Sequence, residues 1–147
     1  MLPLGSGGFS APLNTGTWAL SYPNGSIPLQ LSSNSTAAQN DQINFDVVMS
    51  APSTWELVLT CMTGPANGKV TFYLNQGAGS VINVPIGTID TYSASVTYGV
   101  QFTITGITLG GFETIRRRVQ FTVSGKNAAS TGYTFGWHNF VLMRTDV

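Results

Sequence analysis

Apolar and polar residues alternate with a period of two along most of the chain. Five series place mainly apolar side chains at every second position: Ile43, Phe45, Val47 and Met49; Trp55, Leu57, Leu59 and Cys61; Val70, Phe72 and Leu74; Ile115, Val119, Phe121 and Val123; Tyr133, Phe135, Trp137, Asn139, Val141 and Met143. This period is that of β-strands whose two faces have different surroundings. No series of apolar residues with the spacing of an α-helix reaches a comparable length, so the pattern predicts strands.

Turn-forming clusters separate these series. They are Pro23-Asn24-Gly25, Thr63-Gly64-Pro65, Asn67-Gly68, Gly77-Ala78-Gly79, Gly110-Gly111 and Ser124-Gly125-Lys126-Asn127. With further strands predicted over residues 17–22, 27–31, 80–85 and 96–105, the chain contains about nine short strands. Many short strands with frequent turns are typical of sandwiches. The sequence therefore predicts an all-β protein, a single jelly-roll-like antiparallel β-sandwich.

Residues 1–13 lack this alternation and are rich in Gly, Ser and Pro. We predict an extended N-terminal arm here and a sandwich domain over residues 14–147. The arm is either a disordered end or a segment that orders against a neighbouring subunit. In the second case its apolar anchors are Leu2, Leu4, Phe9 and Leu13.

Charge is scarce and balanced. Only 8% of the 147 residues are charged, with six Lys and Arg against six Asp and Glu. The balance argues against a nucleic-acid partner, which requires a basic surface. No stretch approaches the roughly 18 apolar residues of a membrane helix, and the first residues lack the features of a signal peptide. We expect a single domain with neither nucleic acid nor membrane as partner.

Residues for catalysis are few. His138 is the only histidine, and Cys61 is the only cysteine, placed where a buried small side chain is expected. The acids are Asp41, Asp46, Glu56, Asp90, Glu113 and Asp146. No nucleophile elbow, phosphate-binding loop or Cys-x-x-Cys motif occurs. The sequence predicts no enzyme, no metal site and no cofactor.

Three aromatic residues are candidate glycan contacts: Tyr73, Tyr92 and Trp137. Most aromatic side chains of a small domain belong to its core. Tyr73 lies on the polar face of its strand and Tyr92 lies in a loop, which favours exposure of both. Exposed rings of this kind can stack on a sugar.

Arg117, Phe140 and Leu142 are candidate assembly residues. Alternation places Arg117 on the inward face, unless a β-bulge after Arg116 turns it outward. A third interpretation is a paired charge at a subunit interface, where Arg is enriched. Phe140 and Leu142 face away from Val141 and Met143, so both faces of the last strand carry apolar side chains. We predict that the core of the sandwich covers one face and that a neighbouring subunit covers the other.

The segment from Trp55 to Arg144 resembles the jelly-roll carbohydrate-binding modules of glycoside-degrading enzymes, in particular the family-six type. The resemblance is carried by Phe72-Tyr73-Leu74-Asn75, residues 81–85, residues 108–116 and Gly132-Tyr133-Thr134-Phe135-Gly136-Trp137. It implies a jelly-roll fold and a sugar ligand. The sequence departs at Thr134, where that family usually has a sugar-binding Asn, and residues 15–22 lack that family's acidic calcium ligands.

Residues 89–98 and 125–133 resemble a pattern in module-like domains of bacteriophage virion proteins. With residues 41–59, this similarity covers most of the chain after the arm. It implies a capsid decoration protein, a head fibre or part of a tail fibre.

Two hypotheses on function follow. The first is a phage virion protein, a capsid decoration (cement) protein made in the host cytoplasm without a signal peptide. It would stabilise the outer surface of the head between capsomers, with the major capsid protein and the sister subunits of a homotrimer as partners. The alternative is a carbohydrate-binding module, or a tail-fibre or head-fibre domain, that recognises a host surface glycan. A cement protein predicts a flat self-complementary surface, and a glycan binder predicts exposed aromatic side chains in a pocket or on a sheet face.

Overall fold

The computed structural model describes residues 18–22, 25, 29–32, 41–75, 83–110 and 115–146. The predicted arm over residues 1–13 lies outside these ranges, with its anchors Leu2, Leu4, Phe9 and Leu13. The role given to the arm stays a prediction.

The described residues form nine β-strands and no α-helix. The strands are β1 (Trp18–Ser21), β2 (Leu29–Ser32), β3 (Gln42–Met49), β4 (Ser53–Thr63), β5 (Gly68–Asn75), β6 (Asn83–Asp90), β7 (Thr97–Leu109), β8 (Ile115–Lys126) and β9 (Gly136–Arg144). The described ranges accordingly hold no helix long and apolar enough to cross a membrane.

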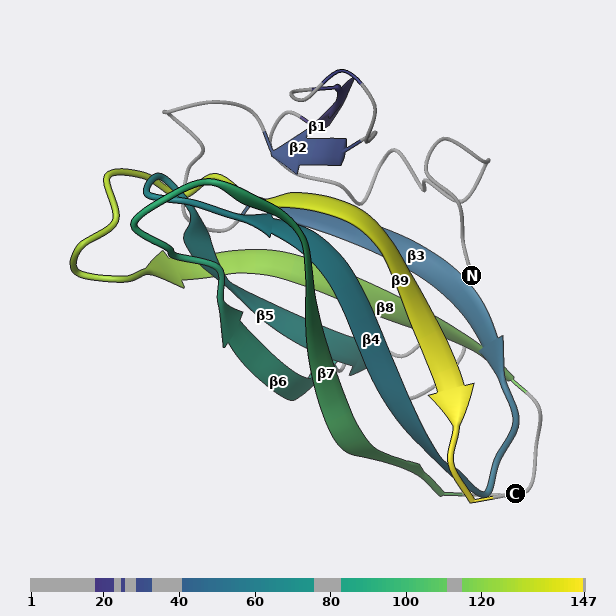
Figure 1. The fold of residues 1–147 in the computed structure, drawn as a ribbon. Helices are drawn as coiled ribbons and strands as arrows, with labels where there is room; N and C mark the ends of the chain where they lie inside the picture. Colours follow the sequence, from purple (N-terminus) through teal and green to yellow (C-terminus); the bar gives the residue numbers. More distant parts are fainter. Residues whose placement is uncertain are drawn as a thin grey trace.

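The strands form two antiparallel sheets that lie face to face (Figure 1). One has five strands in the order β1-β2-β9-β4-β7, and the other has four in the order β3-β8-β5-β6. Most neighbours within each sheet are far apart in sequence, as β3 and β8 show. The protein is a jelly-roll-like antiparallel β-sandwich, and this confirms the predicted fold class.

A cluster of aromatic side chains fills the space between the sheets. Phe121 on β8 is fully buried and packs near Phe72, Phe140 and Phe45, with ring centroids 4.7, 5.1 and 5.3 Å away. These rings come from both sheets. The apolar series of β3, β4, β5 and β8 therefore lie on the two inner faces, as the alternation predicted.

The boundaries of β6 differ from the prediction. The strand was expected over residues 80–85, but it runs from Asn83 to Asp90. Pro85 lies inside the strand because β6 is an edge strand, where a missing backbone N–H removes no hydrogen bond within the sheet. A register shift between Phe72 and Tyr73 of β5 leaves Ile86 without a partner opposite, which also interrupts the alternation of β6.

A bulge in β9 corrects two sequence predictions. Thr60 pairs with Asn139 and Cys61 pairs with Trp137, so His138 is an extra residue in β9. The bulge changes the phase of the alternation, and Trp137, Phe140 and Leu142 therefore all face inward. Trp137 and Phe140 are each 1% exposed, while Leu142 is half-buried against the core. The burial of Trp137 and Phe140 contradicts their predicted roles as surface contacts, whereas the assembly role given to Leu142 stays a prediction.

Arg117 lies on the inner face of β8. It pairs with Val47 of β3, and the register between these strands shows no shift along its whole length. The bulge proposed to turn Arg117 outward is therefore absent, and its side chain is 4% exposed. Because it is buried in the sandwich, Arg117 does not present a charge on the outer surface as the interface hypothesis required.

Candidate functional site

The outer face of the four-stranded sheet carries polar side chains on all four strands. Alternation turns Phe45, Phe72 and Phe121 inward and the residues beside them outward. We call this surface the Tyr73 face. Its polar members are Gln42, Asn44, Asp46, Thr71, Tyr73, Thr88, Arg118, Gln120 and Thr122.

Tyr73 lies in the middle of this face, between Gln120 of β8 and Pro85 of β6. The same row continues to Asn44 of β3, which pairs with Gln120. The Tyr73 side chain is half-buried, whereas Asn44 and Gln120 are only 2% and 9% exposed. Neighbouring strands lie about 4.8 Å apart. The Tyr73 ring is therefore the partly accessible group of this row and can stack on a sugar ring, whereas the two amides beside it are buried.

Hydrogen bonds hold the polar side chains of this face in place. Gln120 Nε2 donates to Gln42 Oε1 at 3.1 Å and to Thr122 Oγ1 at 2.8 Å. The hydroxyls of Thr71 and Thr88 lie 2.8 Å apart and share a hydrogen bond. Side chains that are already ordered lose less entropy when a ligand binds. Gln120, Thr71 and Thr122 are buried, so these bonds satisfy them within the domain, and they hold the exposed Thr88 hydroxyl in place.

One ion pair borders the face. Arg118 Nε lies 3.3 Å from Asp46 Oδ1, and each side chain is about one-third exposed. A pair this open to solvent adds little to the free energy of unfolding, about 0–1 kcal/mol. Its value to a binding surface is different, because it places charged donors and acceptors next to Gln120 and Asn44.

Tyr92 belongs to another region. It follows the end of β6, and its backbone N–H donates to Asp90 Oδ1 at 3.0 Å. Asn127 Nδ2 donates to the other oxygen of Asp90 at 2.8 Å, which ties two loops together. The rise along β6 from Pro85, beside Tyr73, to Asp90 is about 17 Å. The structure therefore does not bring Tyr92 and Tyr73 together.

Two of the acids considered for catalysis, Asp46 and Asp90, have structural partners. Asp46 pairs with Arg118, and Asp90 accepts from Asn127. His138 occupies the bulge in β9, where it is half-buried. Within the described ranges, no three His, Cys, Asp or Glu side chains group where they could hold a metal ion. The chemistry that the Tyr73 face displays is hydrogen bonding and stacking.

Cys61 is fully buried on β4, as the sequence predicted, and burial raises the pKa of its thiol to about 12. The reactive thiolate is therefore scarce at pH 8. We expect iodoacetamide to leave the native protein unmodified at pH 8 and to modify it in concentrated urea, as measured by mass spectrometry. Rapid modification of the native protein would contradict the burial of Cys61.

Alternation predicted the outward direction of Tyr73 but not its surroundings. The polar positions of β3 and β8 can be read from the sequence, yet nothing in it states that Gln120 lies between Asn44 and Tyr73. That order depends on pairing between strands that are far apart in the chain. The signal that could have found the site is the run of polar residues at alternate positions of three strands.

No protein-family model matches the sequence, and no curated protein matches it significantly. Solved structures do match. A xanthan lyase from Paenibacillus aligns with 98% of this chain at 19% identity and a TM-score of 0.67, over 14% of its own length. The CBM36-1 domain of a multidomain xylanase from the hindgut metagenome of Trinervitermes trinervoides aligns with 95% of this chain and 97% of its own, at 14% identity and a TM-score of 0.56.

A third match is the enzymatically active domain of tailspike protein 4 of bacteriophage CBA120. It aligns with 90% of this chain and 19% of its own length, at 13% identity and a TM-score of 0.52. These likenesses show the fold. The chain thus corresponds to small parts of the lyase and the tailspike, and to nearly the whole of the carbohydrate-binding module.

Proposed function

We propose that this chain is a carbohydrate-binding domain that holds a glycan on the Tyr73 face. The observation that carries the proposal is the partly exposed Tyr73 ring between Gln120 and Pro85. Sugars present both apolar C–H faces and hydroxyl edges. The Tyr73 ring covers the first by stacking, and the exposed Thr88 hydroxyl and the partly exposed Arg118–Asp46 pair bind the second.

The fold supports this proposal. A carbohydrate-binding module shares it over almost the full length of both chains. In Figure 1 the four-stranded sheet forms one layer of the sandwich, with the five-stranded sheet against its inner face. The sequence hypothesis of glycan recognition is thereby favoured over capsid decoration.

A virion role is the second candidate, because a phage tailspike domain shares the fold. The last strand gives a capsid decoration role little support, because Phe140 lies in the core and Leu142 packs against it. A role as a homotrimer on a capsid stays a prediction. A fibre domain that binds a host glycan satisfies both the tailspike likeness and the Tyr73 face.

Screening the purified chain on a glycan array, followed by nuclear magnetic resonance titration, tests the proposal. We expect at least one oligosaccharide to bind saturably and to shift the backbone amides of Tyr73, Thr88, Gln120 and their neighbours. Shifts confined to the loop that holds Tyr92, or an array without a ligand, would count against the Tyr73 face as a glycan site.

A further inference from the structure

A hollow of about 280 Å³ opens on one side of the sandwich, between β3 and β9. β3 is the edge strand of its sheet, and β9 pairs with β2 only at Gly136 and Trp137. Among the described residues, no strand therefore closes this side next to the second half of β9. The hollow is lined by Asp46, Val47, Val48, Met49, Trp55, Phe140 and Leu142.

The walls of the hollow are apolar and open to solvent. Asp46 is the one charged lining residue, and its carboxylate is already paired with Arg118 at 3.3 Å. Val48 is 67% exposed, and Trp55 and Leu142 are only partly buried. Covering a contiguous apolar surface of this kind is favoured in water. The occupant that fits the hollow is therefore an apolar, uncharged group.

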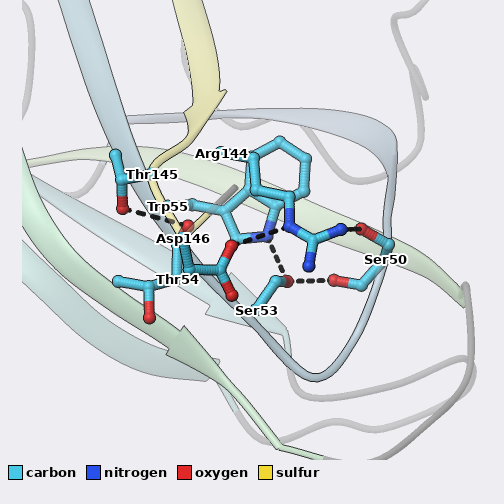
Figure 2. A network of polar contacts seen from close by, with 7 residues as sticks. All are labelled: Ser50, Ser53, Thr54, Trp55, Arg144, Thr145 and Asp146. Carbon is cyan, nitrogen blue, oxygen red and sulfur yellow. Dashed lines mark hydrogen bonds and ion pairs between the residues drawn. The ribbon is translucent and has the colours of Figure 1, made fainter.

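Polar contacts fix the end of the hollow where β3 leads into β4 (Figure 2). Trp55 Nε1 donates to Ser53 Oγ at 2.6 Å, and the Ser53 hydroxyl donates in turn to the Ser50 carbonyl. Arg144, opposite Trp55 in the sheet, donates from Nη1 to Ser50 Oγ at 3.3 Å. These bonds tie the end of β9 to the turn between β3 and β4, so the Trp55 wall is held in place.

Residues 1–17 precede β1 and have the composition that the hollow requires. No residue among them is charged. Of the segments outside the described ranges, they also carry the most large apolar side chains, which are Met1, Leu2, Leu4, Phe9 and Leu13. The segment over residues 33–40, by contrast, has no apolar residue larger than alanine.

The described fold begins on the same side of the sandwich as the hollow. Trp18 Nε1 donates to the carbonyl of Gln42, the first residue of β3, at 3.1 Å. The lining residues of β3 begin at Asp46 and end at Met49, about 13–23 Å further along this strand. The residues before Trp18 are therefore attached close to the hollow.

The direction of β1 sets how these residues can reach it. β1 and β9 run in the same direction, because each is antiparallel to β2. The chain before Trp18 must therefore reverse to follow β9 toward the hollow, and Asn14 and Gly16 are residue types that form turns. Beyond such a turn, residues 4–13 span about 30 Å when extended, which exceeds the distance required.

We propose that residues 4–13 fold back along the open side of their own domain and place the Phe9 ring in the hollow, against Trp55 and Leu142. Phe9 precedes Leu13 by four residues, or about 13 Å of extended chain, the same distance that separates Gln42 from Asp46. An apolar cavity of about 150 Å³ already holds a benzene ring. A hollow of about 280 Å³ therefore has room for the phenyl group and part of a neighbouring side chain.

The inference goes beyond glycan binding and does not depend on it. A segment docked in this way closes the sandwich between β3 and β9 and belongs to the domain. Its apolar side chains are then not free to bind a capsid or a sister subunit.

Nuclear magnetic resonance of the 147-residue chain tests the contact directly. We expect nuclear Overhauser cross-peaks from the Phe9 ring protons to the methyl groups of Val47 and Leu142. The measurement uses the wild-type chain, so it does not depend on whether a variant folds. Absence of these cross-peaks would overturn the proposal.

Two variants then show whether the ring occupies the hollow. Phe9→Ser should abolish the cross-peaks and shift the indole N–H resonance of Trp55. The indole resonance of Trp137, which is buried at the other end of β9, should keep its position. Ser10→Ala, at the neighbouring position, should leave all of these signals unchanged and serves as the control. An unchanged Trp55 resonance in Phe9→Ser would contradict the proposal.

A mixture of isotope-labelled and unlabelled chains separates the proposal from exchange between two copies. We expect the cross-peaks of Phe9 to arise only within one chain. Cross-peaks between a labelled and an unlabelled chain would assign the hollow to the segment of a second copy and would overturn docking within the domain.

Discussion

Phe121→Ala is expected to remove a large part of the stability of this domain. Phe121 is fully buried, and its ring lies within 5.5 Å of Phe72, Phe140, Phe45 and Trp137, measured between centroids. Truncating a buried Phe lowers the free energy of unfolding by about 3–5 kcal/mol. Small domains have about 5–15 kcal/mol in total. The urea midpoint, followed by tryptophan fluorescence, should therefore fall steeply.

Two other variants calibrate this result. Phe121→Leu keeps most of the apolar volume and should lose clearly less than Phe121→Ala. Val48→Ala removes an exposed side chain of β3 and should change the free energy of unfolding by about 0.5 kcal/mol or less. If Phe121→Ala behaved like Val48→Ala, the assignment of the two inner faces would be incorrect.

Much of this core could be predicted from the sequence, because the inward series obey the period of two. Phe45, Phe72 and Phe121 were all predicted on apolar faces and are buried. The period fails where a bulge intervenes. The extra residue His138 changes the phase of β9, and a bulge of one residue leaves no mark that a hydropathy pattern can reveal.

The candidate site was harder to predict than the core. Its residues come from β3, β8, β5 and β6, whose order in the sheet differs from their order in the chain. Each polar position was visible, but the neighbour relation between Gln120 and Tyr73 depends on register between distant strands. Arg117 shows the opposite case. Strict alternation correctly predicted that its side chain lies inside. The alternative prediction of a bulge, which would have avoided a buried charge, was wrong.

Tyr73→Ala is the variant with the largest expected effect on glycan binding. The ring supplies the apolar surface of the Tyr73 face, and removal of a central aromatic contact typically weakens binding by about 2 kcal/mol or more, which is roughly thirtyfold. The fold should persist, because a partly exposed residue in a cross-strand pair contributes about 1 kcal/mol or less. Affinity and the urea midpoint, measured on the same preparation, separate the two effects.

Calorimetric titration of one array-selected oligosaccharide into the wild type, Tyr73→Phe, Tyr73→Ala and Tyr92→Ala tests the central claim most directly. We predict that the wild type, Tyr73→Phe and Tyr92→Ala bind with similar affinity, because each keeps the ring at position 73, and that Tyr73→Ala loses roughly thirtyfold. Undiminished binding by Tyr73→Ala, with the loss found instead in Tyr92→Ala, would contradict the account and move the glycan site to the loop beyond β6.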